Sequence, residues 1–347
     1  MFSSKNINTY VLTGIVILVA SYVATTMKKP FESTNDEYEL IRKYLLNDSP
    51  LYGYNRPKIW IHTKYDMNAR KWLDFQSRNT TDLNQPYLHL TIQTIINHCG
   101  QDFNVCLIDD ESFSKLLPSW DIDLTIVAEP MRTHFRQLGL LELIFYYGGM
   151  VVPNSFVCIK NLKEFYDVAT SGDQPFVCEA INRTMNLEKQ KHKMLFIPDP
   201  YFMGAKKNDT TILEIVEKVK QLNKTPFFSS EPDFLGIISQ YCLDYINKSK
   251  MNLITGEMIG IKTKSRKTIL LEDLMEEDYL DLNSNAVGIY IPADEVLVRP
   301  KFQYLAYLSK EEILQSRLII AKYMAASILD TTDEYYKNSE IRSVVSL

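Results

Sequence analysis

The pattern of hydrophobic positions is clearest in the middle of the chain, where a helical period gives way to a short apolar strand. Four apolar residues recur there at helical spacing: Leu138, Leu141, Ile144 and Phe145. Gly148 follows them and is free to adopt the left-handed conformation that ends many helices, and residues 150–152 have the composition of a buried strand. Because Pro153 lacks a backbone N–H and favours extended geometry before it, Asn154 and Ser155 should lie on a bend after this strand.

Two further strands and a helix are predicted before this junction. Residues 58–63 and 103–108 are short apolar runs, and residues 84–99 have a helical pattern that ends before Gly100. A strand, a helix and a strand joined by short connections form a right-handed βαβ unit with parallel strands. We therefore expect an α/β fold with a mainly parallel sheet, as in nucleotide-binding domains.

The remainder of the chain continues this alternation. We expect strands at residues 176–180 and 288–291, a loop that enters a strand at 196–204, and helices at 210–219 and 234–246. Ser309 and Glu312 form a capping box that opens another helix, and the folded domain should end near Ser327. Residues 328–347 are a polar tail.

An uncharged run of 18 residues, residues 10–27, is long enough to cross the hydrocarbon core of a bilayer. It predicts a single-pass transmembrane anchor after a short tail, residues 1–9, and before a polar stalk, residues 28–56. A cleaved signal peptide is the alternative, although the apolar run is long for one. More basic residues follow the run than precede it, which favours a cytoplasmic position for the large domain. This bias is small, so the orientation stays open.

The composition and the absence of known motifs exclude several classes of function but do not identify one. The chain of 347 residues has a formal net charge of −5 and no basic stripe interleaved with aromatic residues, so nucleic acid is not expected as a partner. The five cysteines show no CxxC spacing, which argues against a zinc site and against a dense disulfide framework. The signatures of serine hydrolases, zinc proteases and P-loop proteins are absent from the sequence.

Polar residues gather where ligands of open α/β sheets bind, beyond the carboxyl ends of the strands. His62 ends the first predicted strand, and Asp109 follows the second, where an acid either contacts a nucleotide or caps the next helix. Arg132 and Arg136 lie in the first turns of the central helix, at the end where the helix dipole disfavours cations. A bound diphosphate would offset these charges, and so would nearby acids: Asp121, Asp123 or Glu129.

From the central helix through Gly148-Gly149 to the next strand, the sequence resembles DXD-motif glycosyltransferases of GT-A fold, of capsular-polysaccharide and mannosyltransferase type. It is most similar to the glycosyltransferase-like proteins of giant DNA viruses. The resemblance implies that residues 57–327 form a GT-A-like domain that takes a nucleotide-sugar donor and a glycan or protein acceptor. Together with the polar residues described above, it gives nine candidate donor contacts: His62, Asp109, Arg132, Arg136, Gly148, Gly149, Asn154, Ser155 and Lys206. It also implies an acceptor base at Glu231 or Asp233, although either acid alternatively begins the helix that follows.

The resemblance breaks at the metal site. Where these enzymes carry Asp-x-Asp, whose carboxylates hold a divalent cation against the donor diphosphate, this chain has Pro153-Asn154-Ser155. The Asp and Arg usual in the preceding helix are replaced by Gln137 and Leu140. We therefore expect no tight divalent metal, and Mn²⁺ or Mg²⁺ would need acids from elsewhere, such as Asp109 or Glu179.

Two functions remain open from the sequence. The first is a membrane-anchored glycosyltransferase, transferring a hexose without a DXD-bound metal and stabilising the leaving diphosphate with basic side chains. The second is a non-catalytic protein of the same fold, a membrane-tethered binding or structural module such as a viral protein would be. The sequence names neither the donor sugar, the acceptor nor the oligomeric state.

Overall fold

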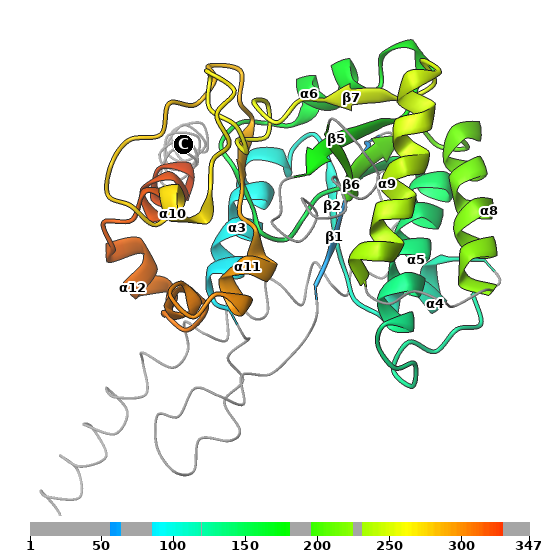
Figure 1. Ribbon diagram of the computed structural model, residues 1–347, viewed down its shortest axis with the longest axis horizontal. Helices are drawn as coiled ribbons and strands as arrows, with labels where there is room; N and C mark the ends of the chain where they lie inside the picture. Colours follow the sequence, from blue (N-terminus) through cyan, green and yellow to red (C-terminus); the bar gives the residue numbers. More distant parts are fainter. Residues whose placement is uncertain (1–55, 64–84, 119, 181–195, 225–230, 329–347) are drawn as a thin grey trace, which may run out of the picture. The chain divides into compact units, whose positions relative to one another are not determined.

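Figure 1 shows a computed structural model of the chain, which describes residues 56–63, 85–118, 120–180, 196–224 and 231–328. All of these residues belong to one compact unit, residues 49–347. The predicted N-terminal tail, the anchor at residues 10–27 and nearly all of the stalk lie outside the described residues, as does the tail from residue 329. Within the described residues, no helix combines the length and hydrophobicity that a bilayer crossing needs.

A mixed sheet of six strands forms the centre of this unit. In spatial order the strands are β2 (Asn104–Ile108), β1 (Lys58–His62), β3 (Gly149–Val151), β6 (Ile197–Ala205), β5 (Phe176–Ala180) and β7 (Asn252–Ile254). β1 is parallel to β2 and β3, β5 is parallel to β7, and β6 is antiparallel to both of its neighbours. All strands but β6 therefore run in one direction, which confirms the predicted α/β fold with a mostly parallel sheet.

The junction around the double glycine forms as its pattern predicts. α5 (Met131–Tyr147) ends at Gly148, which has φ 70° and ψ −170°, and the N–H of Gly148 donates to the carbonyl of Ile144 at 2.8 Å. The predicted positive φ is confirmed. Gly149 also has a positive φ of 93°, and a Cβ atom there would lie 2.2 Å from the carbonyl oxygen of Lys58. The double glycine thus lets α5 turn directly into β3 beside β1.

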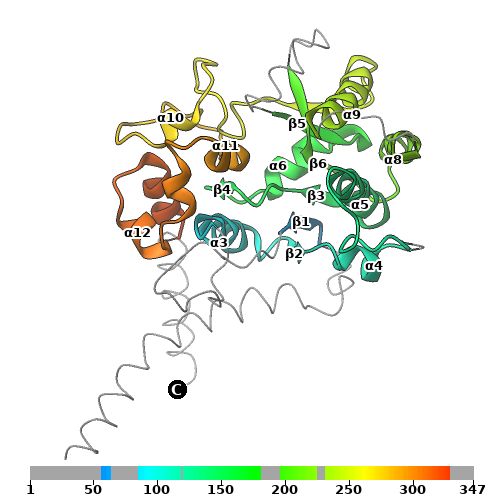
Figure 2. The same cartoon turned by 60° about the horizontal axis from the view of Figure 1, so that its bottom comes forward.

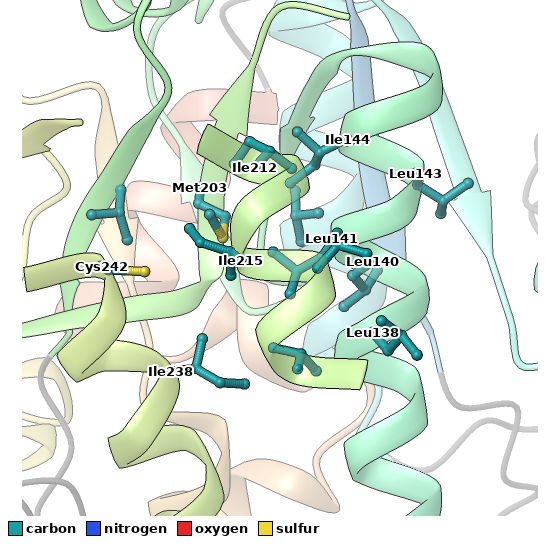
Figure 3. Packing of buried hydrophobic residues seen from close by; sticks show 14 of the residues in the cluster. Leu138, Leu140, Leu141, Leu143, Ile144, Met203, Ile212, Ile215, Ile238 and Cys242 are labelled. Carbon is teal, nitrogen blue, oxygen red and sulfur yellow. The ribbon is translucent and has the colours of Figure 1, made fainter. Parts of the chain in front are cut away.

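Three helices cover one face of the sheet: α5, α8 (Thr210–Lys224) and α9 (Glu231–Asn247) (Figures 1 and 2). Their apolar residues meet those of β6 in one buried cluster, of which Figure 3 shows a part: Leu138, Leu141, Ile144, Met203, Ile212, Ile215, Ile238 and Cys242. Burial of each aliphatic side chain contributes roughly 1.5–3 kcal/mol. This cluster holds the middle and C-terminal turns of α5 beside the strands, and the rigid helix then fixes where Arg132 and Arg136 lie.

A smaller sheet and several short helices form a second layer. β4 (Phe156–Cys158) pairs antiparallel with β8 (Gly288–Tyr290). Around this pair lie α3 (Tyr87–Cys99), α10 (Leu271–Leu274), α11 (Ala293–Val298) and α12 (Lys310–Gln315). α12 begins at the predicted capping box, in which the Ser309 hydroxyl accepts from the N–H of Glu312. α4 (Ser112–Leu116) follows β2, and α6 (Lys163–Ala169) with the short 3-10 helix η3 (Ser171–Asp173) precedes β5.

One element differs from its prediction in a way that matters for the site. Residues 196–204 are not a loop that enters a strand, because β6 starts at Ile197 and its first four residues are already buried. The strand contains a bulge instead. Val177 of β5 pairs with Met203, but the next residue, Cys178, pairs with Asp199, so Pro200, Tyr201 and Phe202 have no partner in β5.

Candidate functional site

Polar side chains meet at the edge of the sheet where its parallel strands end. β1 ends at His62, β2 ends just before Asp109 and Asp110, and β3 ends just before the bend at Pro153. Because β6 runs the opposite way, its first residues, with Asp199 among them, lie at this same edge. We call it the carboxyl edge.

Arg136 and Asp110 form a bidentate ion pair at the carboxyl edge. Nε and Nη2 of Arg136 each donate to a carboxylate oxygen of Asp110 at 2.6 Å, and Nη1 donates to Glu129 at 3.2 Å. Nε2 of His62 lies 3.0 Å from the same Asp110, and the ring of His62 stacks on Phe113. The predicted donor contacts His62 and Arg136 are therefore brought together, but by a carboxylate of the chain itself.

This network controls the ionisation of Asp110. Partial burial alone would raise the pKa of the Asp110 carboxyl, but hydrogen bonds from Arg136 and His62 outweigh it and hold the pKa well below its ordinary value. The two acids likewise raise the pKa of Arg136 against its burial. The acids that offset Arg136 are thus Asp110 and Glu129, of which the sequence analysis named Glu129 only.

Arg132 is placed differently. It lies half-buried in the first turn of α5, where its Nε donates to the carbonyl of Val127 at 2.8 Å. Among the residues that the structure describes, no carboxylate pairs with Arg132. The two terminal guanidinium nitrogens of Arg132 are therefore better candidates than those of Arg136 to bind an anion at this edge.

The bend that replaces Asp-x-Asp is held by hydrogen bonds to the backbone. The Asn154 amide donates to the carbonyl of His62 at 3.4 Å, and the Ser155 hydroxyl donates to the carbonyl of Ile291 at 2.7 Å. Ser155 is buried, whereas Pro153 and Asn154 are half-buried. Ser155 thus links the bend after β3 to the residue that follows β8. Of the side chains in this bend, that of Asn154 lies at the carboxyl edge, against the end of β1.

Asp109 has the helix-capping role that the sequence offered as the alternative to contact with a nucleotide. Its carboxylate accepts from the N–H of Ser112 at 2.9 Å and from the Ser112 hydroxyl at 2.7 Å, in the turn that starts α4. A carboxylate in this position satisfies amides at a helix start. Contact with a nucleotide remains a prediction for this residue.

Three predicted donor-binding residues lie at the other edge of the sheet. Gly148 precedes β3 and Gly149 begins it, and Lys206 follows β6, where Ala205 pairs with Gly149. Lys206 forms an exposed ion pair with Asp173. The structure therefore does not bring these three residues to the side chains at the carboxyl edge.

The predicted acceptor bases lie at the start of α9. Glu231 is the first residue of this helix, and its side chain is outside what the structure describes. Asp233 is half-buried in the first turn. Both positions agree with the alternative, in which an acid begins the helix and interacts favourably with its dipole, so a catalytic role for either residue stays a prediction.

Asp199, which was not expected from the sequence, is the most buried carboxyl group of the described residues at 5% exposure. It accepts a hydrogen bond from the N–H of Tyr201 at 2.9 Å and another from the phenol of Tyr290. Burial, and to a smaller degree the nearby Asp294, raises the pKa of Asp199 to about 6 despite these bonds. Its signal in the sequence was an acid between two prolines inside an apolar run, which is also typical of a loop.

The residues at the carboxyl edge do not fit a divalent cation. The bend at residues 153–155 supplies no carboxylate. The carboxylate of Asp109 accepts hydrogen bonds from Ser112, and that of Asp110 is paired with Arg136 and His62. Glu179 accepts from Lys262 and from the N–H of Gly256. No group of three or more acids, histidines or cysteines in the described ranges has the geometry of a metal site. Hard cations such as Mg²⁺ need several oxygen ligands, and these residues do not offer them. We therefore assign no chemical step to a metal.

Comparisons with known proteins give a likeness to glycosyltransferases. No protein-family model matches the chain, and no curated protein matches it. The structure of the PaToxG glycosyltransferase is 14% identical and covers 62% of this chain and 81% of its own, with a TM-score of 0.33. The galactosyltransferase LgtC, in complex with donor and acceptor sugar analogues, is 12% identical and covers 72% of this chain and 95% of its own, with a TM-score of 0.34. At these values the likeness supports no assignment of activity, substrate or residue roles.

Proposed function

We propose that this protein is a glycosyltransferase that binds a nucleotide sugar at the carboxyl edge of its sheet and transfers the hexose to a hydroxyl of a glycan or protein. The observation that carries the proposal is the convergence of His62, Asp110, Arg136 and Asn154 at that edge. Open α/β sheets bind their ligands beyond the carboxyl ends of their strands. The double-glycine junction between α5 and β3, on which the resemblance rests, lies at the opposite edge, and β3 runs from it to the carboxyl edge.

The leaving diphosphate needs positive charge, and the site divides this task between two arginines. Arg136 is neutralised by Asp110 and Glu129, so its role is to hold His62 and the start of α5 in place. Arg132 has no carboxylate partner among the described residues and supplies the charge-assisted hydrogen bonds to phosphate. The transfer therefore runs without a cation bound at residues 153–155.

A second candidate function is a non-catalytic binding module of the same fold. The observation that favours it is that Asp109, Arg136 and Ser155 each serve the fold through partners in the chain. A module of this kind would bind a nucleotide sugar without cleaving it. In either case we propose that residues 10–27 anchor the protein in a membrane, which partition of the full chain and of a chain lacking these residues between membranes and buffer would check.

The experiment that tests the proposed function uses the full chain in detergent. Binding of UDP-glucose, UDP-galactose, UDP-N-acetylglucosamine and GDP-mannose is measured by calorimetry, with and without Mn²⁺, and release of the nucleoside diphosphate is then followed with methyl glycosides as acceptors. Saturable binding with acceptor-dependent release supports the transferase. Binding without release supports the module, and no binding of any donor contradicts both. Lys163→Ala, which removes an exposed ion pair on α6, is the control and should change nothing.

A further inference from the structure

Asp199 differs from the other buried carboxyl groups because no Lys or Arg among the described residues pairs with it. Among the described residues, the remaining buried acids each form an ion pair with Lys or Arg: Glu142, Glu179, Glu257 and Glu295. No such pair exists for Asp199, although it is the most buried of the set. A buried carboxylate without a cation lowers stability, and such groups cluster at functional sites.

The backbone around Asp199 is irregular at the same point. The bulge of Pro200, Tyr201 and Phe202 separates Asp199 from the regular part of β6. Bulges of this kind re-aim side chains and are over-represented beside active sites. The amide nitrogen of Gln137 on α5 donates to the carbonyl of Pro200 at 2.9 Å and so holds the bulge in place.

The surroundings of Asp199 suit a ligand that donates hydrogen bonds. The ionisable groups around it are the phenols of Tyr201 and Tyr290, the carboxyl of Asp294, and the buried thiols of Cys178 and Cys242. None of these groups is a cation, and a carboxylate has room for more than the two donors it receives from Tyr201 and Tyr290. An anionic ligand would be repelled, whereas neutral hydroxyl groups would complete the hydrogen bonding.

Asp199 also lies close to the bend that replaces Asp-x-Asp. Tyr290, which donates to Asp199, pairs with Phe156 in the small sheet, and Phe156 follows Ser155 directly. Tyr201 and Tyr290 are partly exposed, so the carboxyl lies beneath side chains that reach the surface. The carboxyl edge thus has a basic part at Arg132 and an acidic, aromatic part at Asp199.

We propose that Asp199 binds the hydroxyl group of a neutral carbohydrate acceptor and takes its proton during transfer, in place of Glu231 or Asp233. This inference rests on the proposed function and adds the acceptor class to it. As the acceptor oxygen forms its bond to the anomeric carbon, the bond from that carbon to the phosphate oxygen breaks. The electron pair leaves with the nucleoside diphosphate, and the acceptor proton moves to the Asp199 carboxylate. A base with a pKa close to the working pH is effective in this role.

The test uses Asp199→Asn in the full chain, which keeps the shape of the side chain and removes the base. Nucleotide-sugar affinity should stay within about twofold, while acceptor-dependent release of the nucleoside diphosphate should fall at least about 100-fold, as expected for loss of a general base. The change of the rate with pH that is centred near pH 6, here called the pH limb, should disappear. Tyr290→Phe removes a hydrogen bond to the carboxylate and should move this limb to higher pH. Glu142→Gln, another buried acid, is the control and should keep the rate and the limb.

The possible failures are distinguishable. If the wild-type protein transfers sugar and Asp199→Asn does so at the same rate with the same pH limb, Asp199 is not the base although the proposed function stands. If no donor binds, the proposed function fails, and the acceptor site is tested alone by titrating methyl glycosides into both proteins. If the wild type binds a methyl glycoside and Asp199→Asn does not, the proposed carbohydrate site at Asp199 stands. If both proteins bind it equally, or neither binds it, the proposal is overturned.

Discussion

At the scale of single residues, the charge of the candidate site is set by Asp110. Its carboxylate receives two hydrogen bonds from Arg136 and one from His62, and this pairing lowers its pKa. Arg136 is therefore a buried cation that has its counter-charge in the fold. Substitution at this position would damage the structure first, so Arg132 is the better position to probe for ligand binding.

Asp110→Asn tests this pairing. It leaves the buried Arg136 with Glu129 alone, and we expect a loss of about 2–4 kcal/mol in the free energy of unfolding at pH 7. Because the folded-state pKa of Asp110 is lowered, its contribution is complete above the ordinary carboxyl pKa near 4 and is lost as the pH falls further. Denaturant unfolding across pH 2–7 should show the two proteins converging at acid pH. A constant difference would contradict the pairing.

Asp199→Asn should have the opposite pH dependence. The folded-state pKa of Asp199 is about 6, above its ordinary value of 3.8, so the wild type loses stability as the pH rises from about 4 to about 6. The variant carries no charge there and should be more stable than the wild type by up to about 3 kcal/mol at pH 8, with little difference at pH 4. Melting temperatures at both pH values measure this effect. A variant that is less stable at pH 8 would show that Asp199 serves the fold.

At the scale of elements, the junction between α5 and β3 depends on Gly148. Its φ of 70° and ψ of −170° lie in a region that is essentially restricted to glycine, and a Cβ atom would come within 2.8 Å of the backbone nitrogen of Lys207. Gly148→Ala should therefore cost about 2–3 kcal/mol in unfolding free energy. Gly172→Ala is the comparison, since Gly172 also has a φ of 70° but has a ψ of 19°, in the left-handed helical region, and nothing lies within 4 Å of its Cβ position. We expect a smaller loss there, about 1 kcal/mol. Equal losses would remove the contact with Lys207 from this explanation.

The elements themselves were predictable because their periods are local. The strand predicted at residues 58–63 is Lys58–His62, and the helix that ends at the double glycine does so with the expected conformation. Strand direction is not encoded in such a pattern. Because β6 is antiparallel, Asp199 at its start lies on the carboxyl edge, whereas Lys206, which was expected to contact the donor, follows its end at the opposite edge.

The partners of the charged residues were less predictable. The sequence required an anion for Arg136 but left a ligand and the acids of the chain equally possible, and the observed partner Asp110 lies 26 positions earlier. Asp199 was missed because its burial, its bulge and the absence of a cation beside it among the described residues all arise from tertiary structure. Asp109 shows the reverse case, in which the cap considered from the sequence is the observed role.

At the scale of the whole molecule, the two edges of the central sheet differ in the side chains that they carry. The carboxyl edge carries Arg132, the Asp110 network and Asp199, and the opposite edge carries the double glycine and Lys206. A site that separates a cation from an uncompensated acid suits a reaction between an anionic donor and a neutral acceptor. The central claim is that this edge binds a nucleotide sugar through arginine and without a divalent metal.

The most direct test is the affinity of the full chain for nucleotide sugars, measured by calorimetry on the wild type and on Arg132→Ala, each with and without EDTA. We expect Arg132→Ala to weaken binding by roughly 1.5–3 kcal/mol, as for loss of a charge-assisted hydrogen bond, and EDTA to change the affinity little. Binding that EDTA abolishes and that Arg132→Ala leaves intact would contradict the account, because a metal held by other acids would then carry the diphosphate.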